Sequence, residues 1–177
     1  VAAARRCRVR VVGSEPGRAR QMNAGARAAR GGILLFLHAD TLPPPGFAAH
    51  LKAVLADPGV ALGAFPFRLD RRRPDLWLVE RLVALRCRLL RLPYGDQGLF
   101  MRRSVFERLG GFRDLPVMED FDLVRRSRAL GRVALAPEPA TTSARRWQAR
   151  GVVRTTFLHQ VCLLAYLLGV APERIAS

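Results

Sequence analysis

An apolar run over residues 33–37 ends abruptly in His38-Ala39-Asp40, and Thr41-Leu42, three prolines and a glycine follow. Such a run is typical of a buried parallel strand, which the prolines and the glycine bring to an end. Ligands bind at the carboxyl ends of strands in open α/β sheets, so Asp40 could hold a divalent cation and, through it, a diphosphate. A strand followed by a simple Asp-Thr turn explains the same residues.

Two further clusters have residue types that bind anions. Arg18, Arg20 and Asn23 stand at the start of an expected helix behind a glycine turn, and helix N-termini with arginines bind phosphate. A solvated helix start would look the same. Residues 145–147, Arg-Arg-Trp, could bind a diphosphate leaving group or cover a surface groove by stacking.

Two further clusters contain acidic residues at the ends of expected elements. Asp96-Gln97 lies between two glycines, which is also a common turn pattern. Glu119-Asp120 begins an expected helix, where the helix dipole favours the ionised carboxylate that a general base needs. Because arginines follow later in the same helix, dipole matching alone could account for these acids.

The elements that must position these residues alternate along the chain. Strands are predicted at residues 8–12, 33–37, 60–69, 98–101 and 132–136, with an extended segment at 141–143. Helices are predicted at residues 18–30, 47–56, 74–92, 104–109 (capped by Ser104), 118–130 and 151–170. Short connections favour an α/β fold with a mostly parallel sheet in one domain spanning residues 1–177. The last helix is too short to span a bilayer comfortably, so we expect a packed or interfacial helix.

The net charge of +16 comes almost entirely from arginine, because Lys52 is the only lysine. Arginine forks match phosphates and carboxylates, so an anionic partner is expected; a compositional bias of the source genome is the alternative. Aromatic residues do not alternate with the basic ones, which argues against a specific nucleic-acid platform. The three cysteines form neither a metal pattern nor a disulfide framework, which favours a reducing, cytoplasmic location.

Taken together and in order, these clusters resemble the family-2 glycosyltransferases of the GT-A (Rossmann-like) fold. The local sequence of these motifs is similar to that of a bacterial subgroup described as arsenosugar-biosynthesis glycosyltransferases. The resemblance covers nearly the whole chain. It is carried by residues 17–25 (GRARQMNAG), 36–41 (FLHADT), 95–100 (GDQGLF) and 118–120 (MED).

The resemblance implies an inverting, metal-assisted transfer of a sugar from a nucleotide-diphosphate donor to a hydroxyl. Asp40 would bind Mn²⁺ or Mg²⁺, and Asp120 would act as general base, with Glu119 orienting the base or the acceptor. His38 stands where many relatives have an aspartate, and a neutral imidazole suits manganese better than magnesium.

The resemblance also assigns binding roles. The donor-binding residues would be Arg18, Arg20, Asn23, Arg145 and Arg146, and the acceptor side would contain Asp96, Gln97 and Trp147. Arg146-Trp147 matches the end of the family's Gln-x-x-Arg-Trp motif, although Ser143 stands in place of the glutamine.

Relative to that family the chain begins at about the third strand, so we expect the leading β-α-β unit of the fold, about 45 to 60 residues, to be lacking. A sheet without those strands would expose an edge and favour self-association into a homo-oligomer.

Two other functions fit parts of the sequence. Residues 71–91 form a basic amphipathic helix, which is typical of a non-catalytic protein that binds anions or the inner membrane surface peripherally. A phosphatase-like domain with Asp40 as nucleophile would need a second aspartate at position 42, which is Leu42.

Overall fold

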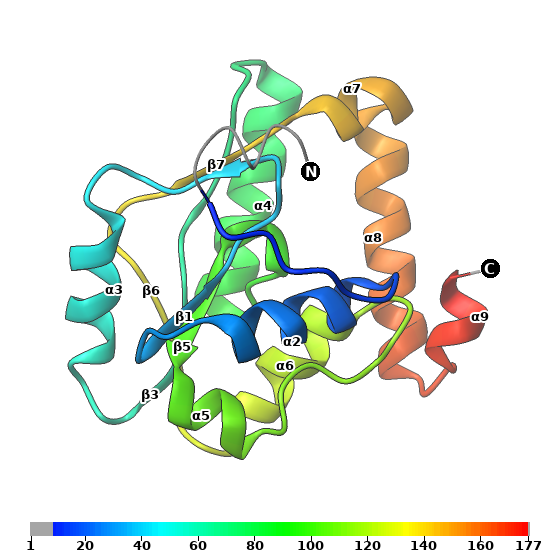
Figure 1. Cartoon of the computed structure of the whole chain (residues 1–177). Coiled ribbons are helices and arrows are strands. Elements are labelled where there is room, and N and C mark those ends of the chain that lie inside the picture. Colours follow the sequence, from blue (N-terminus) through cyan, green and yellow to red (C-terminus); the bar gives the residue numbers. More distant parts are fainter. Residues whose placement is uncertain (1–8, 177) are drawn as a thin grey trace.

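The computed structural model describes residues 9–176, apart from the side chains of Arg146, Arg150, His159 and Ala176. Its main sheet has four strands in the order β1-β5-β3-β6. These strands are β1 (Ile33–Phe36), β3 (Val60–Ala64), β5 (Leu99–Arg102) and β6 (Arg132–Leu135). Helices cover both faces of the sheet (Figure 1), which confirms the predicted α/β class.

The main sheet is mixed. Strands β1, β3 and β6 run in one direction, as predicted, but β5 lies between β1 and β3 and is antiparallel to both. Only β3 and β6 form a parallel pair. The run of β-α-β units before residue 70 predicts parallel neighbours, and nothing in the short apolar run of β5 shows that it inserts in the reverse direction.

A second sheet has three short strands in the order β2-β7-β4. They are β2 (Thr41–Leu42), β4 (Phe67–Leu69) and β7 (Ala140–Thr142). The single strand predicted over residues 60–69 is therefore wrong, because the chain leaves the main sheet at Phe65-Pro66 and starts β4 in the other sheet. Proline cannot donate a ladder hydrogen bond, so the strand breaks there.

Most predicted helices are confirmed within a few residues. They are α2 (Arg18–Ala28), α3 (Phe47–Leu55), α4 (Pro74–Leu90), α5 (Arg103–Arg108), α6 (Glu119–Ser127) and α8 (Val152–Leu167). Two short helices, α7 (Arg145–Arg150) and α9 (Pro172–Ala176), were not predicted. The strand predicted from residue 8 is wrong for residues 9–12, which are irregular and exposed, while Arg8 lies outside the described residues. Ser104 does not cap α5, whose N-cap residue is Arg102.

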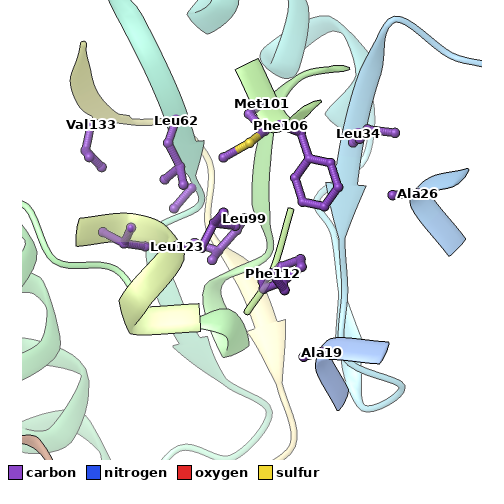
Figure 2. Close-up of a cluster of buried hydrophobic side chains, with 12 residues drawn as sticks. Ala19, Ala26, Leu34, Leu62, Leu99, Met101, Phe106, Phe112, Leu123 and Val133 are labelled. Carbon is purple, nitrogen blue, oxygen red and sulfur yellow. The ribbon is translucent and has the colours of Figure 1, made fainter. Parts of the chain in front are cut away.

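The larger core lies between the main sheet and helices α2, α5 and α6. Figure 2 shows its buried side chains, among them Leu62, Leu99 and Leu123, which are at most 1% exposed. A second core packs α3 against the opposite face of the sheet, where Phe65 and Phe100 are fully buried. These two cores fix β1 and α6, the elements that carry the predicted catalytic residues. Within residues 9–176, no helix is long and apolar enough to cross a membrane.

Candidate active site

The turn after β1 places the first predicted pair. The strand ends at Phe36, and the backbone N–H of Thr41 donates to the carbonyl of His38 at 3.1 Å, which closes a tight turn around Asp40. The Asp40 side chain keeps 39% of its surface exposed. The prediction of a buried parallel strand here is wrong, because β1 is an edge strand that pairs only with the antiparallel β5, and Leu34 alone of its four residues is buried. The strand still leads to a carboxylate that solvent can reach.

A cleft of about 210 Å³ brings together four of the predicted residues, Arg18, His38, Asp96 and Asp120. They come from four separate parts of the chain: α2, the turn after β1, the 3₁₀ turn η1 (Gly95–Gln97) and α6. Five other residues complete its lining, namely Tyr94, Val117, Met118, Phe121 and Cys162. The cleft is therefore a meeting point of loops and helix ends, which is where catalytic groups are usually found.

Asp120 is held in place by two backbone hydrogen bonds. Its Oδ2 accepts from the N–H of Gly95 at 2.7 Å, and its Oδ1 accepts from the N–H of Phe121 at 2.8 Å. Met118, two residues earlier and the N-cap of α6, has a left-handed backbone with φ of 66°. A non-glycine residue in this region is strained, and such strain concentrates at functional sites. The strained turn starts α6 so that Asp120 reaches the cleft.

His38 and Asp120 meet at Gly95. A Cβ atom on Gly95 would lie 2.9 Å from His38 Nε2 and 2.9 Å from Asp120 Oδ2, so the two atoms are at most twice that distance apart. Only a glycine leaves room for both groups here.

We therefore expect Gly95→Ala to reduce activity much more than stability. The methyl group must displace Asp120 or His38, and a misplacement of about 1 Å can cost about 100-fold in rate. The matched control is Gly32→Ala, because a Cβ there meets nothing within 4 Å. The measurements are sugar transfer and thermal unfolding of both variants. Equal activity of the two would contradict this arrangement.

Arg18 links the histidine to the predicted acidic pair. Its Nη2 lies 2.6 Å from His38 Nε2, and its Nε lies 3.1 Å from a carboxylate oxygen of Glu119. Arginine can only donate, so Nε2 of His38 is the acceptor, and a neutral ring carries its proton on Nδ1. One guanidinium thus joins α2, the turn after β1 and α6.

Glu119 lies behind the cleft, with 1% of its surface exposed. Neither carboxylate oxygen has a hydrogen-bond partner within the described residues, so the contact with Arg18 is an ion pair without hydrogen-bond alignment. Burial, and then the neighbouring Asp120 charge, raise the pKa of Glu119, while Arg18 opposes the shift. Its role as the residue that orients the base remains a prediction.

Strand β7 brings Asp40 and Asp96 near each other. The N–H of Ser143 donates to the carbonyl of Asp40 at 3.0 Å, and the hydroxyl of Thr142 donates to the carbonyl of Asp96 at 2.9 Å. Arg145 follows, with its Nη2 3.8 Å from Asp40 Oδ2. The predicted metal ligand and a predicted diphosphate ligand are therefore neighbours.

The donor atoms around Asp40 fit a cation that takes one carboxylate from the protein and its other donor atoms from a bound phosphate and water. In the described part of the chain, no group of three or more His, Cys, Asp and Glu side chains is arranged to hold a metal ion. Arg18 engages the His38 nitrogen that would be the second ligand. A single carboxylate is sufficient for a cation that completes its shell with phosphate oxygens and water.

Other predicted residues have structural contacts. Arg20 pairs with Asp114, with 2.7 Å between nitrogen and oxygen atoms, on the exposed surface. The Asn23 side chain donates to the carbonyl of Phe112 at 2.8 Å and accepts from its N–H at 2.9 Å. These contacts tie α2 to the loop before α6.

The predicted acceptor residues Gln97 and Trp147 are buried. Gln97 is 1% exposed, its amide donates to the carbonyl of Phe65 at 2.9 Å, and its oxygen accepts from the N–H of Tyr94 at 3.2 Å. Trp147 is 5% exposed and packs beside Phe67. The Arg146 side chain lies outside the described residues.

Tyr94 is the main lining residue that the sequence analysis missed. Its hydroxyl is buried with no hydrogen-bond partner among the described residues, and the guanidinium of Arg86 lies 3.6 Å from the centre of its ring. Burial is the main cause that raises its pKa. The sequence feature that could have identified Tyr94 as a lining residue is its position directly before the Gly95-Asp96-Gln97 turn.

A larger groove of about 610 Å³ adjoins the cleft. It lies between α2 and β1, and Arg18 and His38 line both spaces. The groove is therefore open to a ligand that extends from the cleft along β1.

Two solved glycosyltransferase structures are similar to the chain. Glucosyl-3-phosphoglycerate synthase from Mycobacterium tuberculosis, in complex with Mn²⁺, UDP and phosphoglyceric acid, has a TM-score of 0.50 and 17% identity, covering 90% of this chain and 56% of that one. A mannosyltransferase from Pyrobaculum calidifontis, in complex with GDP-Man and Mn²⁺, has a TM-score of 0.49 and 22% identity, covering 73% and 36%. The chain thus spans between about a third and a little over half of these structures.

The sequence comparisons identify the family. Among curated proteins, none matches the chain. The model of the family described as glycosyl transferase family 2 matches residues 2–110, a range that contains Arg18, His38, Asp40 and Asp96. Asp120 lies beyond it. The fold is the mixed α/β fold of the GT-A glycosyltransferases, and the chain belongs to glycosyl transferase family 2.

Proposed function

We propose that the protein transfers a sugar from a nucleoside-diphosphate donor to a hydroxyl acceptor, with inversion at the anomeric carbon. The observation that carries the proposal is the meeting of Asp120, His38 and Asp96 in one cleft that joins a larger groove. A carboxylate held by two backbone donors beside an open groove is suited to act as a base on a substrate bound there.

The donor would occupy the groove between α2 and β1, with its diphosphate near Arg18 and Arg145. Arg20 and Asn23 would act indirectly, by holding α2. Asp40 would hold Mn²⁺ or Mg²⁺, which when bound neutralises charge on the leaving diphosphate. The relatives with bound Mn²⁺ support this choice of ion.

The reaction would be a single displacement. The acceptor oxygen forms a bond to the anomeric carbon while the bond from that carbon to the diphosphate breaks. The acceptor proton passes to Asp120, and the bonding electron pair leaves with the nucleoside diphosphate. Attack opposite the leaving group inverts the anomeric carbon. Asp96, which lines the cleft beside Asp120, would bind the acceptor.

The subgroup, the cellular location, self-association and membrane binding are also proposals. The local sequence supports membership of the arsenosugar-biosynthesis subgroup, and the cysteine pattern supports a cytoplasmic enzyme. Strand β1 is an edge strand of the main sheet, which supports self-association. Peripheral binding at a membrane is supported by the arginines of residues 68–91, and it could accompany catalysis or replace it.

Calorimetric titration of UDP and GDP, with and without Mn²⁺, tests the donor site. We expect one nucleotide to bind in the presence of Mn²⁺, and Asp40→Ala to abolish the metal-dependent part because the carboxylate is the only acidic side chain of that turn. Asp57→Ala is the control, since Asp57 is similarly exposed and pairs with Arg132. Failure of a folded wild-type protein to bind either nucleotide would contradict the proposal.

A further inference from the structure

An apolar groove between α4 and α8 opens next to the candidate catalytic cleft. Its volume is about 490 Å³, within the range of about 300–1,000 Å³ that is usual for small-molecule sites. Leu82, Leu85 and Leu89 of α4 line it, with Trp147 and Leu163 among the remaining residues. The groove is therefore large enough for the tail of a small ligand and offers it a mostly hydrocarbon surface.

The groove adjoins the cleft. Tyr94 and Asp96 line both spaces, and Asp120 lies in the cleft beside them. The shared residues lie just after α4 ends at Leu90. A ligand whose chain fills the groove would consequently present its other end to Asp120.

The apolar surface extends beyond the groove. Leu78, Leu82, Leu85 and Leu89 recur on one face of α4 and are each about half exposed or more, up to 68% for Leu89. On α8, the exposed large apolar side chains are Val153, Phe157, Leu158, Val161, Leu164 and Leu167, and Leu168 follows directly after the helix. Soluble proteins rarely expose so many large apolar residues on adjoining helices unless the surface binds something.

Positive charge surrounds this apolar surface. Residues 68–91 contain eight arginines and three acidic residues. Arg81 and Arg88 are exposed on α4 beside the leucines, and the guanidinium of Arg81 lies 5.0 Å from the centre of the Trp77 ring. Apolar side chains flanked by arginines are complementary to an anionic lipid surface, with phosphates at the rim and hydrocarbon inside.

We propose that the acceptor is a lipid of an anionic membrane, with its hydrocarbon chain in the groove between α4 and α8 and its headgroup hydroxyl at Asp120. This inference rests on the proposed function, because the hydroxyl reacts only if the cleft is catalytic. It adds the substrate class, an amphiphile, and it gives the basic helix α4 a role in delivering that substrate.

The two tryptophans of the chain allow a direct test. Trp147 lines the groove, whereas Trp77 is 55% exposed on the outer face of α4. In a Trp77→Phe variant, all tryptophan fluorescence comes from Trp147. Vesicles of equal parts phosphatidylcholine and phosphatidylglycerol, brominated on the acyl chains, should quench this emission, while unbrominated vesicles of the same composition should not.

The matched variants are Leu85→Glu and Leu135→Glu in the Trp77→Phe background. Both place a charge at a partly exposed leucine, but Leu135 ends β6 and is not part of the groove. We expect Leu85→Glu to weaken vesicle binding about tenfold, since it places a charge on the surface that the lipid chain would cover, and Leu135→Glu to leave binding and quenching unchanged. Thermal unfolding of each variant shows whether it is folded.

The outcomes separate this inference from the proposed function. Vesicle binding without quenching of Trp147 would overturn it, because the lipid chain would then not enter the groove. A dimer in sedimentation equilibrium that Leu85→Glu dissociates would also overturn it, since a second copy would cover the groove. Nucleotide binding without quenching of Trp147 would contradict this inference alone. Quenching without binding of UDP or GDP would show a lipid site but contradict the proposed function.

Discussion

Replacing Asp120 by asparagine should lower the rate of sugar transfer by about 10²–10⁴-fold while nucleotide binding is retained. A positioned general base contributes about that factor. The asparagine oxygen can still accept the hydrogen bond from the Gly95 N–H, but the amide cannot take the acceptor proton. The variant therefore removes the chemistry and preserves most of the geometry.

The measurement is single-turnover release of the nucleoside diphosphate, together with calorimetric binding of the donor nucleotide. Asp57→Asn is the control, because Asp57 is exposed, pairs with Arg132 and does not line the cleft. A tenfold rate change corresponds to about 1.4 kcal/mol in the barrier, so the expected effect far exceeds that of an exposed ion pair. Transfer by Asp120→Asn at the wild-type rate would show that another group is the base.

The residues that line the candidate cleft could be singled out from the sequence because they stand at element ends. His38 follows an apolar strand and Asp120 begins an amphipathic helix, and both positions are visible as changes in pattern. What the pattern cannot show is the direction of β5, which inserts between two strands that precede it in the chain. Strand order depends on long-range packing and leaves no local signal.

The same limit explains why the structural contacts of Asn23 and Gln97 could not be foreseen and why Tyr94 was missed. Asn23 and Gln97 are polar residues beside motif residues, and their amides satisfy buried backbone groups that only the folded chain brings near. Tyr94 lines both the cleft and the groove between α4 and α8. A single tyrosine before a glycine turn nevertheless belongs to no periodic pattern that would identify it. Local sequence indicates where chemistry can occur, and tertiary contacts decide which neighbours take part.

A different aspartate of α6, Asp122, is buried and forms an ion pair with Arg126 on the same helix. Its side chain is 4% exposed, and Arg126 Nε donates to Oδ2 at 2.6 Å. Arg126 also donates to the carbonyls of Leu109 and Gly111 at 2.7 and 2.8 Å. The pair thus joins the helix that carries the proposed base to the loop that precedes it.

Asp122→Ala should destabilise the protein by about 3–5 kcal/mol, because removing one partner leaves the charge of a mostly buried arginine unpaired. For a domain of this size, that loss would lower the midpoint of thermal unfolding by roughly 10 °C. Asp114→Ala provides the contrast: its ion pair with Arg20 is half exposed, and solvent screens such pairs, so the midpoint should hardly change. If both variants unfolded at the wild-type temperature, the Asp122 network would not be what holds α6. If Asp122→Ala alone lost stability and also transferred sugar more slowly while still folded, the helix start would be shown to depend on this buried pair, because Asp122 itself has no contact with the cleft.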